Sequence, residues 1–381
     1  MASAEDRTRT NSGLGPVSVV VCNYNGERYL AECLASVFAL DGVVDDVIVV
    51  DNLSTDGGLS LVRAQFPTVA IVEMGRNEGP CPARNEGMRR AKNRWVLALD
   101  NDAVVTRDML SKLCAAVLAG RGDASAQASA EPSDSPIAIA QPRSVFASEM
   151  SRVHYDGGAL TYTGLIGLRN FYTPIAEAEG AGTVDVDCAV AVALLVDRDA
   201  LLALGGYDET MFILFEDLDL SFRLRATGKR IVSVEDAIVL HKGGTPGISF
   251  REGPSYPGSR VFFHSRNRWT YMAKCFHLRT LVVAAPGIFL YELVWLVFST
   301  LQGGLGPWLR GKWRFAKLAA HVWRERQRFQ TARSVPDRAL LAGGPLTITP
   351  ALKSSGAKAF VLRALDALLR AWWSVARWLA A

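Results

Sequence analysis

The sequence predicts an α/β fold with a mostly parallel sheet flanked by helices, and three observations support this. Short runs of β-branched and other apolar residues alternate with segments whose apolar residues recur at helical spacing. Polar turn residues follow these runs, as at Asn23 and Asp51. Apolar residues make up 49% of the 381 residues, which can supply a core. Strands that alternate with helices favour parallel pairing.

The first hundred residues contain four predicted strands separated by three predicted helices. Each strand is a short apolar run, and the helices carry apolar residues three or four positions apart. In order, these elements are the strand 17–22, the helix of Leu30, Leu34, Val37 and Phe38, the strand 47–50, the helix of Leu59, Leu61, Val62 and Phe66, the strand 69–72, the helix 81–92 and the strand 95–99. The carboxyl ends of such strands are where an open α/β sheet binds ligands.

The middle of the chain continues the pattern with longer loops. Residues 120–136 are rich in Ala, Ser and Asp, and we expect a mobile surface loop there. The Gly- and Pro-rich stretch 242–258 can act as a lid. The other expected elements are one buried strand at 184–196, a helix at 214–226, and strands at 231–234 and 237–240.

The last third of the chain combines a long apolar run with aromatic and basic stretches. Residues 281–301 are long enough to cross a bilayer, but Pro286 interrupts them and Glu292 would be costly at mid-bilayer unless paired. Residues 308–329 and 360–379 mix tryptophans with basic residues. Such stretches suit helices that lie on an anionic leaflet. The alternative is a soluble helical bundle that packs these faces on the rest of the protein.

Charge and cysteine usage narrow the class of protein. The net charge of +4 is small for this length, so it predicts no nucleic-acid partner. The six cysteines form no Cys-x-x-Cys pair and indicate reduced thiols. The polar N-terminal residues are not followed by an apolar core, so we expect no secretory signal. These features predict a cytoplasmic location for the enzyme-sized part of the chain.

An acidic doublet ends the predicted strand 95–99. Side chains alternate along a strand, so Asp100 and Asp102 should project to the same side. Two carboxylates suit a hard divalent cation that keeps room for water and substrate phosphates. The doublet alone is a weak signal, and the alternative, which the doublet by itself favours, is a solvated turn after a strand.

The residues together resemble the inverting family 2 glycosyltransferases with the GT-A fold, in particular rhamnosyltransferase-like members. Six motifs occur in the family's order, namely Val20 to Gly26, Val50 to Asn52 with Ser54 to Gly57, Asn77 to Gly79 with Ala83 to Gly87, Asp100 to Asp102, Phe215 to Leu220, and His241 to Gly244. The resemblance covers roughly residues 16–270 and implies a GT-A catalytic domain there. The composition on either side predicts a flexible tail at 1–15 and a membrane-associated helical region at 271–381.

The resemblance also implies a metal and donor site. Asp102 would hold Mn²⁺ or Mg²⁺ directly, Asp100 would contact the ribose or the metal through water, and His241 would complete the metal shell. Other donor-binding residues would be Asn23, Tyr24, Asn25, Asp51, Asn77, Arg84, Asn101 and Arg266. Three structural alternatives remain: a hydrogen-bonded histidine at 241, a turn cap at Asp51 and a surface charge at Arg84.

The catalytic base should lie in the Glu-Asp pair. In the family the second acid takes the proton of the acceptor hydroxyl, which assigns Asp217 as the general base and Glu216 as a ligand of sugar hydroxyls. The alternative is that both acids favour the dipole at the start of a helix. Asp219 is better explained as a helix-surface pair with Arg223. Arg266 would reach the diphosphate when the predicted lid closes.

The resulting hypothesis is an inverting transfer of a sugar from a UDP-, dTDP- or GDP-sugar to a hydroxyl of a glycan or lipid-linked acceptor. The enzyme would act at the cytoplasmic face of the membrane in cell-envelope polysaccharide synthesis. A sugar-1-phosphate nucleotidylyltransferase is one alternative, but Asn23 to Gly26 replace its Gly-rich, Arg-containing loop. A non-catalytic membrane scaffold is another, although the acids of both predicted sites are present.

Overall fold

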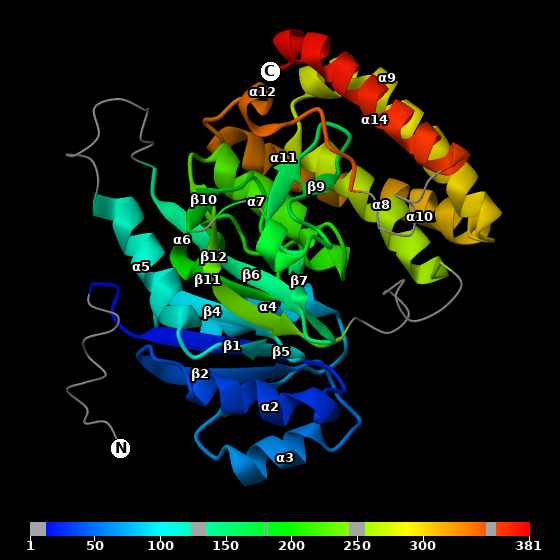
Figure 1. Cartoon of the computed structure of the whole chain (residues 1–381). Helices are drawn as coiled ribbons and strands as arrows, with labels where there is room; N and C mark the ends of the chain where they lie inside the picture. The colour runs from blue at the N-terminus through cyan, green and yellow to red at the C-terminus, as the bar shows by residue number, and fades with distance from the viewer. Residues whose placement is uncertain (1–12, 123–134, 179, 181, 244–255, 348–355) are drawn as a thin grey trace. The chain divides into compact units, whose positions relative to one another are not determined.

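The computed structural model describes residues 13–122, 135–178, 180, 182–243, 256–347 and 356–381, and its contacts form two compact units (Figure 1). The first, here the sheet unit, spans Met1–Gly157, Arg169–Phe212 and Gly228–Lys242. The second, here the helical unit, spans Gly158–Leu168, Ile213–Thr227 and Gly243–Ala381. Most of the predicted tail 1–15, loop 120–136 and lid 242–258 lies outside the described residues. The predicted domain boundary at residue 270 stays a prediction.

Within the described residues the sheet unit holds one ten-stranded sheet of order β10-β12-β6-β11-β4-β1-β2-β3, with β5 beside β12 and β7 beside β6. The strands are β1 Val17–Asn23, β2 Val44–Asp51, β3 Ala70–Glu73, β4 Trp95–Asp100, β5 Ala103–Val105, β6 Ile137–Phe146, β7 Glu149–Tyr155, β10 Thr183–Asp185, β11 Ala193–Asp197 and β12 Arg230–His241. Strands β1 to β4 pair in parallel, as do β6 and β12. The prediction of a mostly parallel sheet is confirmed.

Strand direction decides where the predicted site residues lie. Strand β11 runs antiparallel to both β4 and β6, so β4, β6 and β12 share one direction. Asn23 pairs with Asp51 at the ends of β1 and β2, and Cys22 pairs with Asp100 at the end of β4. His241 ends β12. We call this side of the sheet the carboxyl edge.

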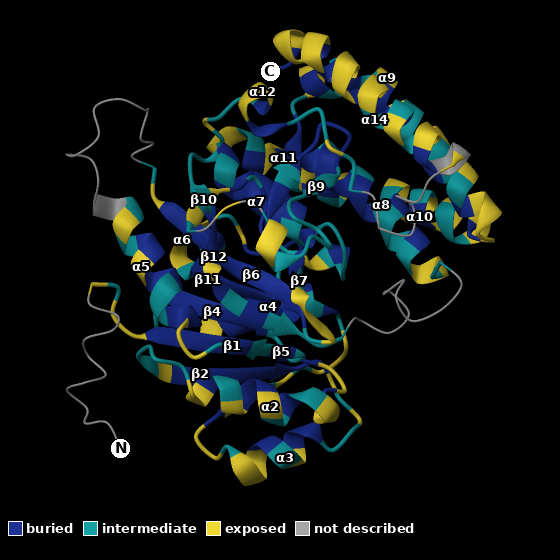
Figure 2. Ribbon diagram, viewed as in Figure 1, coloured by how far each residue is buried: buried dark blue, intermediate teal, exposed yellow. Residues whose placement is uncertain are grey.

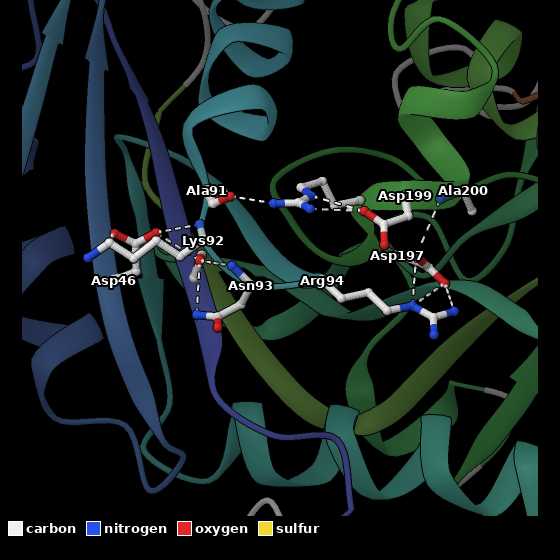
Figure 3. Close-up of polar contacts among 10 residues, drawn as sticks. Asp46, Ala91, Lys92, Asn93, Arg94, Asp197, Asp199 and Ala200 are labelled. Carbon is white, nitrogen blue, oxygen red and sulfur yellow. Dashed lines mark hydrogen bonds and ion pairs between the residues drawn. The ribbon is translucent and has the colours of Figure 1, made fainter.

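The opposite edge of the sheet is fixed by polar contacts near the strand starts (Figure 3). Asp46 accepts hydrogen bonds from the Ser18 hydroxyl at 2.9 Å and from the backbone N–H of Lys92 at 3.0 Å. Arg94 forms an ion pair of 2.6 Å with Asp197 at the end of β11. These contacts join β1, β2, β4 and β11 on the side away from the carboxyl edge.

Helices cover both faces of the sheet, as the alternation of elements predicts. In the sheet unit they are α2 Glu27–Phe38, α3 Gly58–Gln65, α4 Pro80–Arg90, α5 Met109–Gly122 and α6 Arg198–Ala203. Buried residues of α2, α3 and α5 form one core with Val19 and Val21 of β1. Gly87 of α4 lies against Val20, whose side chain points to the other face. All six cysteines are buried thiols, which agrees with the expected reduced state.

The predicted single strand at 184–196 is wrong. Its first residues belong to β10 at one end of the sheet, whereas its last residues form β11 between β6 and β4. The chain leaves the sheet between them, and the side chain of Gln141 accepts the backbone N–H of Val190 at 2.8 Å. The sequence pattern does not reveal this break, because the alternation of valine and aspartate at 184–187 suits a strand and so does the apolar run 188–196. The two strands predicted at 231–240 instead form one strand, β12, with an irregular register between Val234 and Ile238.

The helical unit consists of helices with a small hairpin. Its elements are β8 Gly158–Leu160, β9 Ile166–Leu168, α7 Glu216–Ala226, α8 Gly258–Cys275, α9 Leu278–Leu301, α10 Leu305–Lys317, α11 Ala319–Ala332, α12 Asp337–Leu340 and α14 Ala357–Ala376. Helix α9 runs unbroken through Pro286. The aromatic and basic stretch 308–329 is not one helix but two, separated at Leu318. The break lets Val322 and Phe329 of α11 become buried, and no Gly or Pro marks it in the sequence.

Candidate functional site

The ends of β1 and β2 are joined through the Asp51 carboxylate. Asn23 Nδ2 donates to Asp51 Oδ1 at 2.7 Å, and the backbone N–H of Ser54 donates to Asp51 Oδ2 at 2.8 Å. The Ser54 hydroxyl donates to Oδ1 at 2.5 Å. Asp51 is only 1% exposed. Its two contacts with Ser54 are those of a turn cap, which is the structural alternative for this residue. A contact between Asp51 and a nucleobase stays a prediction.

The loop after β1 is tied to the loop after β2. The Asn25 amide oxygen accepts the backbone N–H of Thr55 at 2.8 Å, and the Asn25 N–H donates to Ser54 Oγ at 2.8 Å. Tyr24 between these anchors is 49% exposed. The loops therefore present an exposed aromatic ring on a fixed backbone, which suits stacking on a planar base.

Asn101 links the acidic doublet to β1. Its Nδ2 donates to Asn23 Oδ1 at 2.8 Å. A Cβ at Gly26 would lie 2.1 Å from Asn101 Nδ2 and 2.2 Å from Asn23 Oδ1, so only glycine leaves room for this contact. The predicted donor residues Asn23, Asn25 and Asn101 thus build the loop framework of the carboxyl edge.

Asp100 forms an ion pair with a buried arginine. Arg84 Nη2 lies 2.8 Å from Asp100 Oδ1, and Arg84 is 4% exposed. The alternative of a surface charge at Arg84 is therefore wrong. Burial raises the pKa of the Asp100 carboxyl, and the adjacent guanidinium opposes that rise. The pair places a fixed positive group beside the doublet, where an anionic ligand can use it.

Asp102 and His241 lie side by side at the same edge. The pairing of Ala103 with His241 in β5 and β12 brings Asp102 Oδ2 to 3.2 Å from His241 Nε2. On its other side, His241 Nδ1 lies 2.9 Å from Nδ1 of His154 in β7. One of these two nitrogens must carry the proton. His154 is not among the residues predicted from the sequence, because a single histidine gives no spacing signal that could reveal it.

This donor set fits a divalent cation with few protein ligands. A carboxylate and an imidazole suit Mn²⁺ somewhat better than Mg²⁺. Among the described residues there is no group of three or more His, Cys, Asp or Glu side chains arranged for a metal. Two protein donors leave coordination positions for water and phosphate oxygens, which is the usual arrangement for a metal that binds with a diphosphate.

Asn77 organises the turn that precedes α4. Its side-chain oxygen accepts the backbone N–H of Gly79 at 3.0 Å, and the asparagine itself is exposed. Gly79 has a φ of 86°, which lets the chain enter the helix that carries Arg84. The contact is a turn contact, and donor binding by Asn77 stays a prediction.

Glu216 and Asp217 begin α7 in the helical unit. Leu214 and Phe215, the two residues before them, have φ values of 70° and 72°, which are unusual for non-glycine residues. Asn267 of α8 holds this segment, donating from Nδ2 to the carbonyl oxygens of Ile213 at 2.9 Å and Leu214 at 2.8 Å. Strained backbone of this kind is concentrated at functional sites. Asn267 is thus a positioning residue, a role that the sequence motifs did not reveal.

The two acids differ in exposure. Glu216 is buried, whereas Asp217 is one of the partly exposed residues of α7. The expected pair of Asp219 and Arg223 forms, at 2.7 Å, but its predicted surface position is wrong. Both side chains are buried, and Lys274 of α8 also lies 2.7 Å from Asp219. A wheel describes a single helix and does not show that α8 covers this face.

Arg266 lies on α8 of the helical unit, among aromatic side chains. Its Nε donates to Asn267 Oδ1 at 2.7 Å, and its guanidinium lies 5.1 Å from the centre of the Phe263 ring. These contacts hold Arg266 beside the residue that positions the start of α7. A contact between Arg266 and the diphosphate stays a prediction.

Part of the chain is similar to known proteins. Residues 18–169 match the model of Glycosyl transferase family 2. The chain is 38% identical over 98 residues to the succinoglycan biosynthesis protein ExoO of Rhizobium meliloti (strain 1021), covering 26% of this chain and 28% of that protein. It is 26% identical over 275 residues to the N-acetylglucosaminyl-diphospho-decaprenol L-rhamnosyltransferase of Mycobacterium tuberculosis (strain CDC 1551 / Oshkosh), covering 67% of this chain and 83% of that protein.

The fold comparison points the same way. The crystal structure of GalNAc-T7 with UDP, GalNAc and Mn²⁺ superposes with a TM-score of 0.51 at 16% identity, over 72% of this chain and 51% of that one. The chain spans 28% of the Rhizobium relative and 39% of TuaG, a putative teichuronic acid biosynthesis glycosyltransferase of Bacillus subtilis (strain 168). Residues 18–169 thus match glycosyl transferase family 2, and the chain has a GT-A fold.

Proposed function

We propose that this chain is a metal-assisted, inverting glycosyltransferase of cell-envelope polysaccharide synthesis. It would take a sugar from a nucleoside diphosphate and add it to a hydroxyl of a glycan or lipid-linked acceptor at the cytoplasmic face of the membrane. The observation that carries the proposal is the contact of 3.2 Å between Asp102 and His241, at the same edge as the pair of Asp100 and Arg84. The rhamnosyltransferase relative favours a deoxysugar donor.

Donor binding would use the carboxyl edge. Asp102 and His241 would hold Mn²⁺ or Mg²⁺, which as a Lewis acid stabilises negative charge on the leaving diphosphate. Arg84, fixed by Asp100, would pair with the anionic donor. Tyr24 would stack on the base, with the loop held by Asn25. Fixed charges of this kind need no reorganisation during the reaction.

Transfer would use the acids of α7. The acceptor oxygen attacks the anomeric carbon while the bond from that carbon to the diphosphate oxygen breaks and its electron pair leaves with the diphosphate. Asp217 would take the hydroxyl proton, and Glu216 would bind sugar hydroxyls. Attack opposite the leaving group inverts the anomeric configuration.

A panel of nucleotide sugars tests the proposal. The full-length protein is mixed in turn with UDP-, dTDP- and GDP-sugars, with Mn²⁺ or with a chelator, and binding and slow release of nucleoside diphosphate are measured. We expect at least one donor to bind and to be hydrolysed in a manner that depends on Mn²⁺. If no donor binds, or if a nucleotide sugar with added pyrophosphate is converted to a nucleoside triphosphate and a sugar 1-phosphate, the proposal is wrong, and the latter result indicates a nucleotidylyltransferase.

A further inference from the structure

Helices α9 and α14 each carry a row of exposed apolar side chains. Figure 2 colours long stretches of both helices as exposed. Large apolar side chains that are at least 41% exposed occur along their whole length, namely Leu278, Val282, Phe289, Leu293, Val297 and Leu301 of α9 and Phe360, Val361, Leu368, Trp372 and Val375 of α14. A monomeric soluble protein rarely exposes so large an apolar patch, so the surface indicates a partner.

The two helices lie against each other with their ends reversed. Trp372 Nε1 of α14 donates to the Val283 carbonyl of α9 at 3.1 Å. Nearer the chain end, the backbone N–H of Ala381 donates to Thr280 Oγ1 at 3.2 Å. The Tyr162 hydroxyl, which lies beside Gly287 of α9, donates to the Leu369 carbonyl of α14 at 3.0 Å. The apolar side chains therefore belong to one packed pair of helices.

Helix α9 is long and apolar enough to cross a membrane, but the face opposite its exposed side chains packs against other helices. Trp295 Nε1 donates to Ser265 Oγ of α8 at 2.9 Å, and Arg268 of α8 is buried against the same helix. Only 22% of the most apolar 18 residues of α9 are buried, so it is not the core helix of a soluble domain. The helix has one attached face and one exposed face.

A charged cluster fixes the middle of α9. The Glu292 carboxylate forms ion pairs of 2.7 Å with Arg268 of α8 and 2.6 Å with Lys312 of α10. It also accepts the indole N–H groups of Trp269 at 2.9 Å and Trp308 at 3.0 Å. Glu292 has the partners that its position in an apolar run required, and they come from two neighbouring helices.

These attachments argue against a span. If α9 crossed a bilayer, its middle would carry α8 and α10 to mid-bilayer depth. Charged side chains are costly at mid-bilayer depth unless they are paired. The basic residues on those two helices are Arg260, Arg266, Arg268, Lys274, Arg310, Lys312, Arg314 and Lys317. A position in the membrane plane avoids this cost, because only the exposed faces of α9 and α14 then enter the lipid.

Basic side chains next to the apolar residues favour an anionic membrane leaflet as the partner of this surface. On α10 the exposed Leu305, Leu309 and Trp313 follow each other at four-residue spacing. The exposed basic side chains Arg310 and Arg314 lie next to this stripe on the helical wheel. An apolar stripe flanked by basic residues is typical of helices that bind anionic membrane surfaces in the plane of the bilayer.

We infer that α9 and α14 form a monotopic platform, with α10 beside them, which enters one leaflet of an anionic phospholipid membrane without crossing it. This inference rests on the membrane association in the proposed function but not on the transfer chemistry. Both ends of α9 then stay on the membrane side that carries the rest of the chain.

Binding to vesicles tests whether an anionic membrane is the partner of this surface. The full-length protein is sedimented with vesicles of phosphatidylcholine alone or with added phosphatidylglycerol. We expect binding to the anionic vesicles and at least a tenfold weaker binding for the double variant Phe289→Asp/Leu293→Asp. Met150→Asp, at a 62% exposed apolar residue of the sheet unit, is the matched control. Equal binding by the double variant, or self-association in place of vesicle binding, would overturn the inference.

Cysteine labelling tests the orientation of α9. Arg279→Cys and Gln302→Cys place exposed thiols near the two ends of the helix, while the six native thiols are buried. An impermeant maleimide is applied to spheroplasts and to inside-out vesicles from cells that express the full chain. We expect both positions to react only in inside-out vesicles. Labelling of the two positions from opposite sides would show a span and overturn the platform, but it would leave the nucleotide-sugar assay unaffected.

Discussion

The imidazole of His241 lies between two partners, with Nε2 at 3.2 Å from Asp102 Oδ2 and Nδ1 at 2.9 Å from His154 Nδ1. The two histidine rings lie nearly parallel, with an interplanar angle of 15°. The contact with His154 orients the ring so that Nε2 is directed to the acidic doublet. A ligand histidine held through its second nitrogen is the common arrangement at metal sites.

Removal of the His154 side chain should weaken metal binding and should leave the loops that are predicted to bind the donor unchanged. We expect His154→Phe to lower the affinity for Mn²⁺ about 10- to 100-fold, since such supporting contacts have effects of that size. His154→Gln keeps a polar partner and should recover part of the loss. Mn²⁺ titration of transfer activity gives both values, and an unchanged Mn²⁺ dependence in His154→Phe would exclude a positioning role.

Asp217 and Glu216 can be separated by isosteric changes. Asp217→Asn should retain affinity for the nucleotide sugar while transfer falls at least about 100-fold, because a general base acts on the chemical step. Glu216→Gln is the matched comparison, with a smaller loss expected. Near-normal transfer by Asp217→Asn, measured with donor affinity on the same preparation, would move the base role to Glu216.

Loss of a buried ion pair in the helical unit should lower stability much more than loss of an exposed ion pair in the sheet unit. Asp219 is fully buried between Arg223 and Lys274, and its removal leaves two buried cations. We expect Asp219→Ala to lower the free energy of unfolding by about 3–5 kcal/mol. Asp199→Ala, at an exposed pair with Arg198, should change it by less than about 1 kcal/mol. Urea denaturation measures both, and equal effects would contradict the buried arrangement.

His264 should make stability depend on pH. The ring stacks on Trp295 at 3.9 Å, and burial holds its pKa well below 6.5, aided by nearby Arg268. The folded state therefore binds fewer protons than the unfolded state below pH 6.5, so this contribution to stability is present above that pH and is lost as pH falls. We expect the melting temperature of His264→Phe to fall less between pH 7 and pH 5 than that of the wild type. An equal fall in both proteins would show that His264 does not titrate in this range.

The sequence could predict which residues reach the carboxyl edge, because parallel strands end on the same side. Asn23, Asp51 and Asp100 all lie there. It could not decide between a turn cap and a donor contact at Asp51, since both roles use the same residue type. Nor could it predict His154, because its place depends on the pairing of β7 with β6, which no local pattern records.

The helical unit shows a similar limit. The apolar run implied that Glu292 needs a partner, and periodicity located the helix that carries it. The identity of the partners, Arg268 and Lys312, depends on how three helices pack. For the same reason the burial of Asp219 and the break at Leu318 were not predictable from one helix at a time.

The most direct test of the proposed site is the Mn²⁺ dependence of nucleotide binding in Asp102→Ala. UDP, dTDP and GDP are titrated into the full-length protein with and without Mn²⁺, with Asp199→Ala, on the other side of the sheet, as the control (Figure 3). We expect Mn²⁺ to tighten binding of at least one nucleotide about tenfold or more in the wild type and in Asp199→Ala, and to have no effect in Asp102→Ala. An equal Mn²⁺ effect in Asp102→Ala would contradict the assignment of Asp102 as the metal ligand.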